Sequence, residues 1–82
     1  MYKIRVFITL KEGILDPAGI ATENTLHKLD FADVRDVRIG KLVEFTVEQA
    51  EDLEARVKQM CEKLLVNTVM ETYRYEIEEI AS

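Results

Sequence analysis

The side chains that could carry out chemistry in this chain are few, and their positions keep them apart. The 82 residues contain one cysteine, Cys61, and one histidine, His27. A Cys–His nucleophile pair needs both side chains within hydrogen-bonding distance. Helical periodicity places His27 on the outer face of one predicted helix and Cys61 in the core stripe of another. We therefore expect a surface histidine and a small packed cysteine, with no catalytic pair.

No other pattern of residues indicates an active site or a bound group. One cysteine cannot form an internal disulfide, and a single Cys with a single His does not make a zinc site. The carboxylates are numerous, but no two stand in an apolar setting that would separate their pKa values. The sequence has no phosphate-binding G-x-x-x-x-G-K-[ST] loop, and Gly13 and Gly19 do not fit a dinucleotide fingerprint. We expect no catalytic residue, no cofactor and no metal in this chain.

The composition and charge of the chain exclude several classes of protein. With 48% hydrophobic and 33% charged residues, the chain reads as one folded domain spanning residues 1–82. Its 11 basic and 16 acidic residues give a formal charge of -5, which disfavours binding to nucleic acid or to an anionic membrane surface. No apolar run reaches the roughly 20 residues that cross a bilayer, and the N-terminus alternates where a signal peptide would be continuously apolar. We expect a cytoplasmic protein.

The first half of the chain predicts a strand followed by a helix. Residues 2–10 alternate between apolar and mostly polar side chains, which is typical of a strand buried on one side. Asp16 can cap a helix, and Pro17 suits the first helical position, where a missing N–H costs nothing. The helix should run over residues 18–29 and end near Asp30. Its apolar arc comprises Ala18, Ala21, Thr22, Thr25, Leu26 and Leu29.

The second half predicts a hairpin, a helix and a final strand. Residues 34–47 read as a hairpin with a bulged turn at Gly40, because only this register sets Val37 and Ile39 on the same face as Phe45 and Val43. Residues 50–65 predict the strongest helix, and residues 73–78 alternate again as a strand. The stripe of the second helix comprises Ala50, Leu53, Val57, Met60, Cys61, Leu64 and Leu65. Asn67 is a plausible cap at its C-terminal end.

The order of elements predicts the fold class. Strand, helix, strand, strand, helix, strand is the α+β ferredoxin-like split βαβ arrangement, βαββαβ. Because crossover connections are right-handed, both helices should cover the same face of a four-stranded antiparallel sheet. The other face would then be bare. Its expected residues are Lys3, Arg5, Phe7, Asp36, Arg38, Leu42, Glu44, Thr46, Arg74, Glu76 and Glu78.

This bare face favours an interface with another protein. Mixed charges around Phe7 and Leu42 suit a protein contact, and a domain this short gains from added burial, since it buries only about 60 to 65% of its unfolded surface. A solvated, salt-bridged face is the plainer alternative. RNA-recognition domains share the topology, but they stack bases on several aromatics in basic surroundings, and here the central strands offer Phe7 alone. Ile20, apolar on the polar side of its helix, is either a single exposed residue or a partner contact.

Three segments give the chain a recognisable resemblance. They are Leu10 to Gly19 (LKEGILDPAG), Val37 to Lys41 (VRIGK) and Met60 to Asn67 (MCEKLLVN). In these segments, and in length and element order, the chain closely resembles the PurS family. This family provides the small subunit of the multi-subunit phosphoribosylformylglycinamidine (FGAM) synthase of de novo purine biosynthesis.

The resemblance implies a bridging role without an active site. Family members dimerise and join the synthetase subunit PurL to the glutaminase subunit PurQ, supporting ammonia transfer. The complex, a ligase, converts formylglycinamide ribonucleotide (FGAR), glutamine and ATP to FGAM, and uses ATP and magnesium that this chain does not bind. The resemblance supplies no catalytic residue. Its matched positions, Asp16, Pro17, Gly19, Arg38, Gly40 and Lys41, become candidate partner contacts together with Phe7 and Leu42.

A second hypothesis of a different class is a small-molecule regulatory module of the ACT type. Such modules have the same element order and a glycine after the first strand, and they bind amino acids between dimer partners. Such modules start their helix almost directly after that glycine, whereas in this chain the helix starts later, at Asp16-Pro17. They are also usually fused to an enzyme, whereas we expect this domain to stand alone. Thermal stabilisation by an amino acid would favour this alternative.

Overall fold

The computed structural model describes residues 1–48 and 51–80 and gives three strands and two helices. The elements are β1 (Tyr2–Leu10), α1 (Pro17–Lys28), β2 (Lys41–Val47), α2 (Leu53–Met60) continued by a π-helical turn (Cys61–Leu65), and β3 (Glu71–Glu79). The predicted strands at 2–10 and 73–78 and the first helix are confirmed. The second helix begins at Leu53, and Ala50, which was expected to start it, lies outside the described residues.

The sheet is antiparallel with the order β2-β1-β3, so β1 is central. Alternation along β1 places Ile4, Val6 and Ile8 on one face, where they are almost completely buried. Register aligns Ile4 with Phe45 of β2 and Ile77 of β3, so the apolar side chains of all three strands share this face. The second helix covers it with the buried Val57 and Cys61. The expected inward position of Tyr73, Tyr75 and Ile77 is confirmed.

The π-helical turn changes which side chains reach the core. The Val66 N–H donates to the Cys61 carbonyl oxygen at 2.8 Å, five residues back. A π turn holds more residues than an α turn, so the apolar stripe drifts out of phase after Cys61. Leu64, expected in the core, is 83% exposed for this reason. The C-terminal cap of the turn is Val66, and Asn67 instead organises the following turn through its side-chain acceptor for the Val69 N–H.

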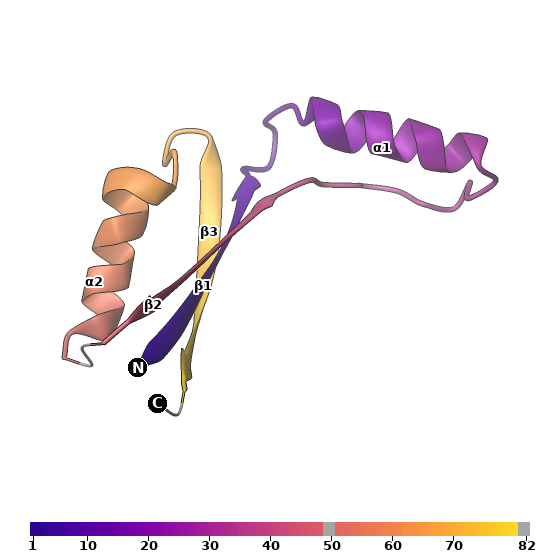
Figure 1. Cartoon of the computed structure of the whole chain (residues 1–82). Helices are drawn as coiled ribbons and strands as arrows, with labels where there is room; N and C mark the ends of the chain where they lie inside the picture. The colour runs from indigo at the N-terminus through magenta and orange to yellow at the C-terminus, as the bar shows by residue number, and fades with distance from the viewer. Residues whose placement is uncertain (49–50, 81–82) are drawn as a thin grey trace.

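A second unit projects from the end of the sheet (Figure 1). We call it the arm; it comprises α1 and the extended segment 31–40, which returns alongside the helix. The radius of gyration is 16.3 Å, whereas a compact chain of this length would have one of about 12 Å. The molecule measures 49 × 30 × 14 Å. The arm therefore stands outside the core and adds surface to it.

Two expectations about the fold are wrong. Residues 34–39 do not form a strand in the sheet, so the bulged hairpin at Gly40 is absent and three strands are seen in place of four. Only α2, and not α1, covers the sheet face (Figure 1). The cause is local, because the N–H groups of Val37 and Ile39 donate to carboxylates on the α1 side of the arm and not to β2.

Candidate partner interface

Asp16 organises the base of the arm. Its Oδ1 accepts the Gly19 N–H at 2.9 Å and so caps α1, while its Oδ2 accepts the Ile39 N–H at 3.0 Å. The Arg38 guanidinium lies 3.9 Å from the same carboxylate. The hydrogen bond from Gly19, then that from Ile39, with a contribution from Arg38, lower the pKa of Asp16 below its ordinary value. The predicted cap is confirmed, and it also binds the returning segment.

Further hydrogen bonds join the two limbs of the arm. The His27 Nε2 lies 2.8 Å from the Val34 carbonyl oxygen, so this imidazole closes the far end of the arm instead of pointing into solvent. Glu23 accepts the Val37 N–H at 3.2 Å near the middle. Arg38 donates to the carbonyl oxygens of Leu10 and Lys11 at 3.0 and 3.3 Å. These contacts hold the limbs together and anchor the arm to the end of β1.

The candidate residues from the sequence fall into three places. Asp16, Pro17, Gly19 and Arg38 lie together at the base of the arm. A Cβ on Gly19 would collide with the Val37 carbonyl oxygen, which explains glycine there. The second place is the junction with β2, which holds Gly40 and Lys41. The third is the sheet face that α2 does not cover, where β1 and β2 pair Phe7 with Leu42.

The junction is fixed by contacts to the sheet. A Cβ on Gly40 would lie 2.5 Å from the Ile8 carbonyl oxygen, so the chain can pass this close only without a side chain. Lys41 Nζ lies 3.2 Å from Glu71 Oε2 in an ion pair. The Glu71 carboxylate also accepts the Asn67 N–H at 2.8 Å. This hydrogen bond first, and Lys41 second, lower the pKa of Glu71.

The sheet face opposite α2 carries paired charges around an aromatic ring. Arg74 lies over the ring of Phe7, 3.9 Å from its centroid. Arg5 pairs with Glu78 at 2.9 Å and with Glu44 at 3.3 Å, and its pKa is raised, chiefly by the hydrogen bond to Glu78. Asp36 and Arg38 were expected on this face and instead lie in the arm. The charges of the face therefore largely satisfy one another.

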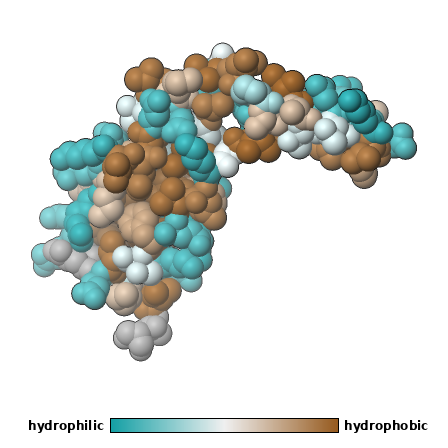
Figure 2. Space-filling view, turned by 45° about the horizontal axis from the view of Figure 1, so that its top comes forward, coloured by the Kyte–Doolittle hydropathy of each residue, from teal (hydrophilic) through white to brown (hydrophobic). Residues whose placement is uncertain are grey.

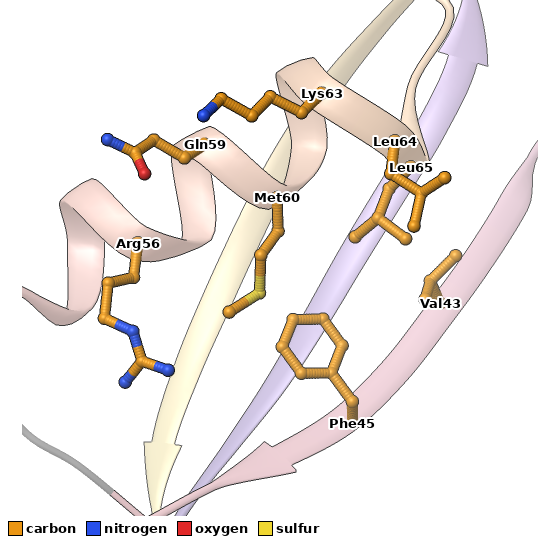
Figure 3. Close-up of a pocket in the computed structure, with 8 residues that line it drawn as sticks. All are labelled: Val43, Phe45, Arg56, Gln59, Met60, Lys63, Leu64 and Leu65. Atoms are coloured by element: carbon orange, nitrogen blue, oxygen red, sulfur yellow. The ribbon is translucent and has the colours of Figure 1, made fainter.

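A groove between α2 and β2 went unrecognised in the sequence (Figure 3). It has a volume of about 510 Å³. Val43 and Phe45 of β2 form its floor, Met60 and Leu65 reach into it, and Leu64 stands at one end. Arg56, Gln59 and Lys63 line its polar side along α2. The prediction that α1 covers this part of the sheet concealed the groove, because it assigned the space to the chain's own helix.

The predicted apolar face of α1 is mostly exposed, and of its residues only Leu26 is half-buried. We call it the α1 stripe; it comprises Ala18, Ala21, Thr22, Thr25, Leu26 and Leu29. Leu29 is 60% exposed, and the neighbouring Phe31 is 52% exposed. Ile20, on another side of the helix, is 49% exposed beside the base of the arm. Figure 2 shows apolar surface both on the sheet unit and along the arm.

The described residues do not assemble the elements of a reactive site. His27 lies in the arm on α1, whereas Cys61 is buried under the sheet at the end of α2. Burial first, and Glu62 second, raise the pKa of the Cys61 thiol, which makes it less nucleophilic. Within residues 1–48 and 51–80, no group of three or more His, Cys, Asp or Glu side chains could hold a metal ion. In the same residues no helix is both long and apolar enough to span a membrane.

Comparison with known proteins places the chain beside one family over nearly its whole length. Residues 3–79 match a sequence model described as PurS, phosphoribosylformylglycinamidine (FGAM) synthase. The FGAM synthase subunit PurS of Bacillus subtilis is 53% identical over 83 residues, covering 100% of this chain and 99% of that protein. A solved Bacillus subtilis PurS structure is 55% identical with a TM-score of 0.88, covering 96% of this chain and 100% of that one.

A solved assembly also contains a similar chain. One chain of the PurLQS structure from Thermotoga maritima is 30% identical to this protein, with a TM-score of 0.71. The likeness covers 96% of each of the two chains. The extended shape is thus shared with experimentally solved relatives, and the comparisons support the first of the two hypotheses drawn from the sequence.

Proposed function

The chain belongs to the PurS family of subunits of FGAM synthase, an enzyme of purine biosynthesis, and on this basis we propose that it bridges the two larger subunits of that enzyme. The observation that carries the proposal is the likeness, over nearly the full chain, to one chain of the PurLQS structure. A protein of this shape has much surface and little interior. Such a molecule suits a part whose work is contact with neighbours.

Holding the larger subunits together has a chemical purpose. In the proposed scheme the glutaminase subunit PurQ releases ammonia, and the synthetase subunit PurL uses it with ATP to convert FGAR to FGAM. Ammonia released into water would diffuse away or become protonated, so holding the donor and acceptor sites together raises its effective concentration. ATP and magnesium belong to the synthetase subunit in this scheme, and the present chain contributes no catalytic group.

We assign the contacts with neighbours to the three places described above. The base of the arm presents Asp16, Pro17, Gly19 and Arg38 beside the exposed Ile20. The junction with β2 presents Gly40 and Lys41, and the sheet face presents Phe7 and Leu42. We further propose that the chain acts as a homo-oligomer, at least a dimer. The exposed apolar side chains on the arm support this proposal, because contiguous exposed apolar surface marks interaction sites.

Reconstitution of the enzyme tests the bridging role. The synthetase and glutaminase subunits are purified separately and mixed with FGAR, ATP and magnesium, with or without this chain. We expect glutamine-dependent formation of FGAM only when the chain is present, whereas formation of FGAM from added ammonium salt should not need it. The ammonium reaction is the internal control, because it bypasses transfer between subunits. Full glutamine-dependent activity without the chain would overturn the proposal.

A further inference from the structure

The arm meets the sheet unit, which consists of β1–β3 and α2, where the chain crosses from one to the other (Figure 1). Within the described residues, α1 packs along neither the sheet nor α2. Inside the arm, Asp16, Glu23 and His27 bind the returning segment to α1, so the arm behaves as one stapled unit. Its direction relative to the sheet unit is therefore decided by the contacts at the crossing.

Two contacts at this crossing follow each other along the returning segment. At Gly40 the backbone passes so close to β1 that an added Cβ would lie 2.5 Å from the Ile8 carbonyl oxygen. At Arg38 the side chain makes the contact, since its Nη2 donates to the carbonyl oxygens of Leu10 and Lys11 at 3.0 and 3.3 Å. Because two separate points on one segment are held against β1, the direction of the segment is defined.

The Arg38 side chain replaces backbone pairing where the ladder between β1 and β2 has ended. The last pair of that ladder is Ile8 with Lys41, and the same register, continued, would set Lys11 opposite Arg38. The Arg38 Nε also lies 3.9 Å from the Asp16 carboxylate that caps α1. A guanidinium suits this place because its planar fork donates in several directions, whereas lysine has a single nitrogen on a flexible stem. One side chain therefore links the end of β1, the returning segment and the start of α1.

We propose that Arg38 fixes the angle between the arm and the sheet unit, and that it is thereby a positioning residue for the glutamine-dependent reaction of the enzyme. The inference rests on the proposed bridging role, in which contacts are assigned to the arm as well as to the sheet face. A change in the angle would displace the glutaminase and synthetase subunits relative to each other. Such a displacement matters, since a shift of about 1 Å in groups that must be held in position can cost roughly 100-fold in rate.

Fixing the angle is a different role from touching a neighbour. The Arg38 side chain is 39% exposed, so a direct contact with a larger subunit is compatible with its position. A guanidinium that only contacted a neighbour would leave the free chain unchanged when it is removed. A guanidinium that fixes the angle acts in the free chain as well, so the arm must lose its single direction there. The first measurement is therefore made on the chain without the larger subunits.

Double electron–electron resonance measures the angle as a distance between two spin labels. Asp33→Cys in the arm and Thr68→Cys before β3 provide the labelling sites, since both residues are exposed whereas Cys61 is buried. Labelled chain is diluted with unlabelled wild-type chain, so that distances within one copy are recorded. We expect one narrow distance with Arg38 present and a broad distribution in Arg38→Ala. Arg35→Ala removes the same kind of side chain from an exposed position on the same segment and should keep the narrow distance.

The second measurement is the coupling of glutamine hydrolysis to FGAM formation in the reconstituted enzyme. Glutamate and FGAM are quantified together, and the glutamine-dependent rate is divided by the ammonium-dependent rate of the same mixture. The wild-type chain and Arg35→Ala should give equal amounts of glutamate and FGAM. Arg38→Ala should give glutamate in excess, because ammonia is lost between displaced subunits, and Arg38→Lys should restore part of the coupling. Circular dichroism confirms that every variant is folded.

The outcomes separate this inference from the bridging role. A narrow, wild-type distance in Arg38→Ala overturns the inference, and so does coupling in Arg38→Ala equal to that in Arg35→Ala. Loss of coupling with an unchanged distance would assign Arg38 to a direct contact instead. Failure of the bridging role is recognised independently, because the wild-type chain would then add nothing to glutamine-dependent activity, whereas the distance measurement on the free chain does not depend on the enzyme.

Discussion

The carboxylate of Asp16 accepts the backbone N–H of Ile39 at 3.0 Å, across 23 residues of sequence. Its other oxygen caps α1 through Gly19. One side chain therefore both starts the helix and holds the returning segment beside it. Because the N–H of Ile39 donates to Asp16, it cannot also pair with β2. The hairpin that the local sequence pattern predicts therefore does not form.

Asp16→Asn should keep the helix cap and release the returning segment. Asparagine caps helices about as well as aspartate, but once its oxygen serves Gly19, its amide nitrogen offers Ile39 a donor in place of an acceptor. We expect hydrogen exchange at the Ile39 amide to speed up roughly 5- to 10-fold, corresponding to the loss of one net hydrogen bond, with little change at Gly19. Asp33→Asn, on an exposed aspartate of the arm, is the control and should change neither. Equal protection of Ile39 in both variants would contradict the assigned role.

The pKa of Asp16 gives the arm a pH dependence with a definite sign. Hydrogen bonds from Gly19 and Ile39 lower the folded-state pKa of Asp16 below the ordinary 3.8. The ionised carboxylate therefore stabilises the arm fully at a pH above the ordinary pKa. This stabilisation is lost as the pH falls through the lowered folded-state pKa. An NMR titration of the Ile39 amide should show its midpoint below 3.8, and the titration should be flat in Asp16→Asn. A midpoint at or above the ordinary value would refute the prediction.

Gly19→Ala should destabilise the arm even though it improves helix propensity. In an ordinary helix interior this change stabilises by about 1 kcal/mol. Here the added Cβ would overlap the Val37 carbonyl oxygen and press on the Asp16 carboxylate. We expect a lower thermal midpoint and faster exchange in the arm, whereas Asn24→Ala, on the exposed side of the same helix, should be neutral or slightly stabilising. A rise in midpoint for Gly19→Ala would show that the limbs are not in close contact.

The same substitution at a buried and at an exposed valine should lower the free energy of unfolding by different amounts. Val57 is completely buried under the sheet, whereas Val69 is 79% exposed. Val57→Ala should lower the free energy of unfolding by about 1–3 kcal/mol, and Val69→Ala by less than about 0.5 kcal/mol. Urea denaturation followed by circular dichroism measures both. Comparable losses would mean that α2 does not cover β1 as described.

Cys61 should report unfolding through its reactivity. The side chain is fully buried, and burial raises the pKa of its thiol, so both access and thiolate content oppose reaction. We expect slow labelling by Ellman's reagent in buffer and rapid labelling in urea. Because it is the sole cysteine, the signal needs no background variant. Complete labelling of the native protein within the mixing time would be inconsistent with the described core.

Local sequence was sufficient to predict most of the elements and the family. Alternation in residues 2–10 and 73–78 specifies strands because one side of each is buried, and Asp16-Pro17 specifies a helix start because a cap and a missing N–H both suit that position. These signals lie within a few residues of the feature they predict. The candidate residues at the base of the arm were found through the resemblance to the family, in the segments that carry it.

The positions of the first helix and of segment 31–40 depend instead on contacts between residues far apart in the chain. An apolar stripe reports that a helix face is to be buried, but its period is the same whether the covering surface belongs to the same chain or to another. Likewise, the alternation of Val37 and Ile39 suits either a strand in the sheet or a segment held by Glu23 and Asp16. Which acceptors take those N–H groups depends on side chains 14 and 23 residues away, and no local pattern records that competition.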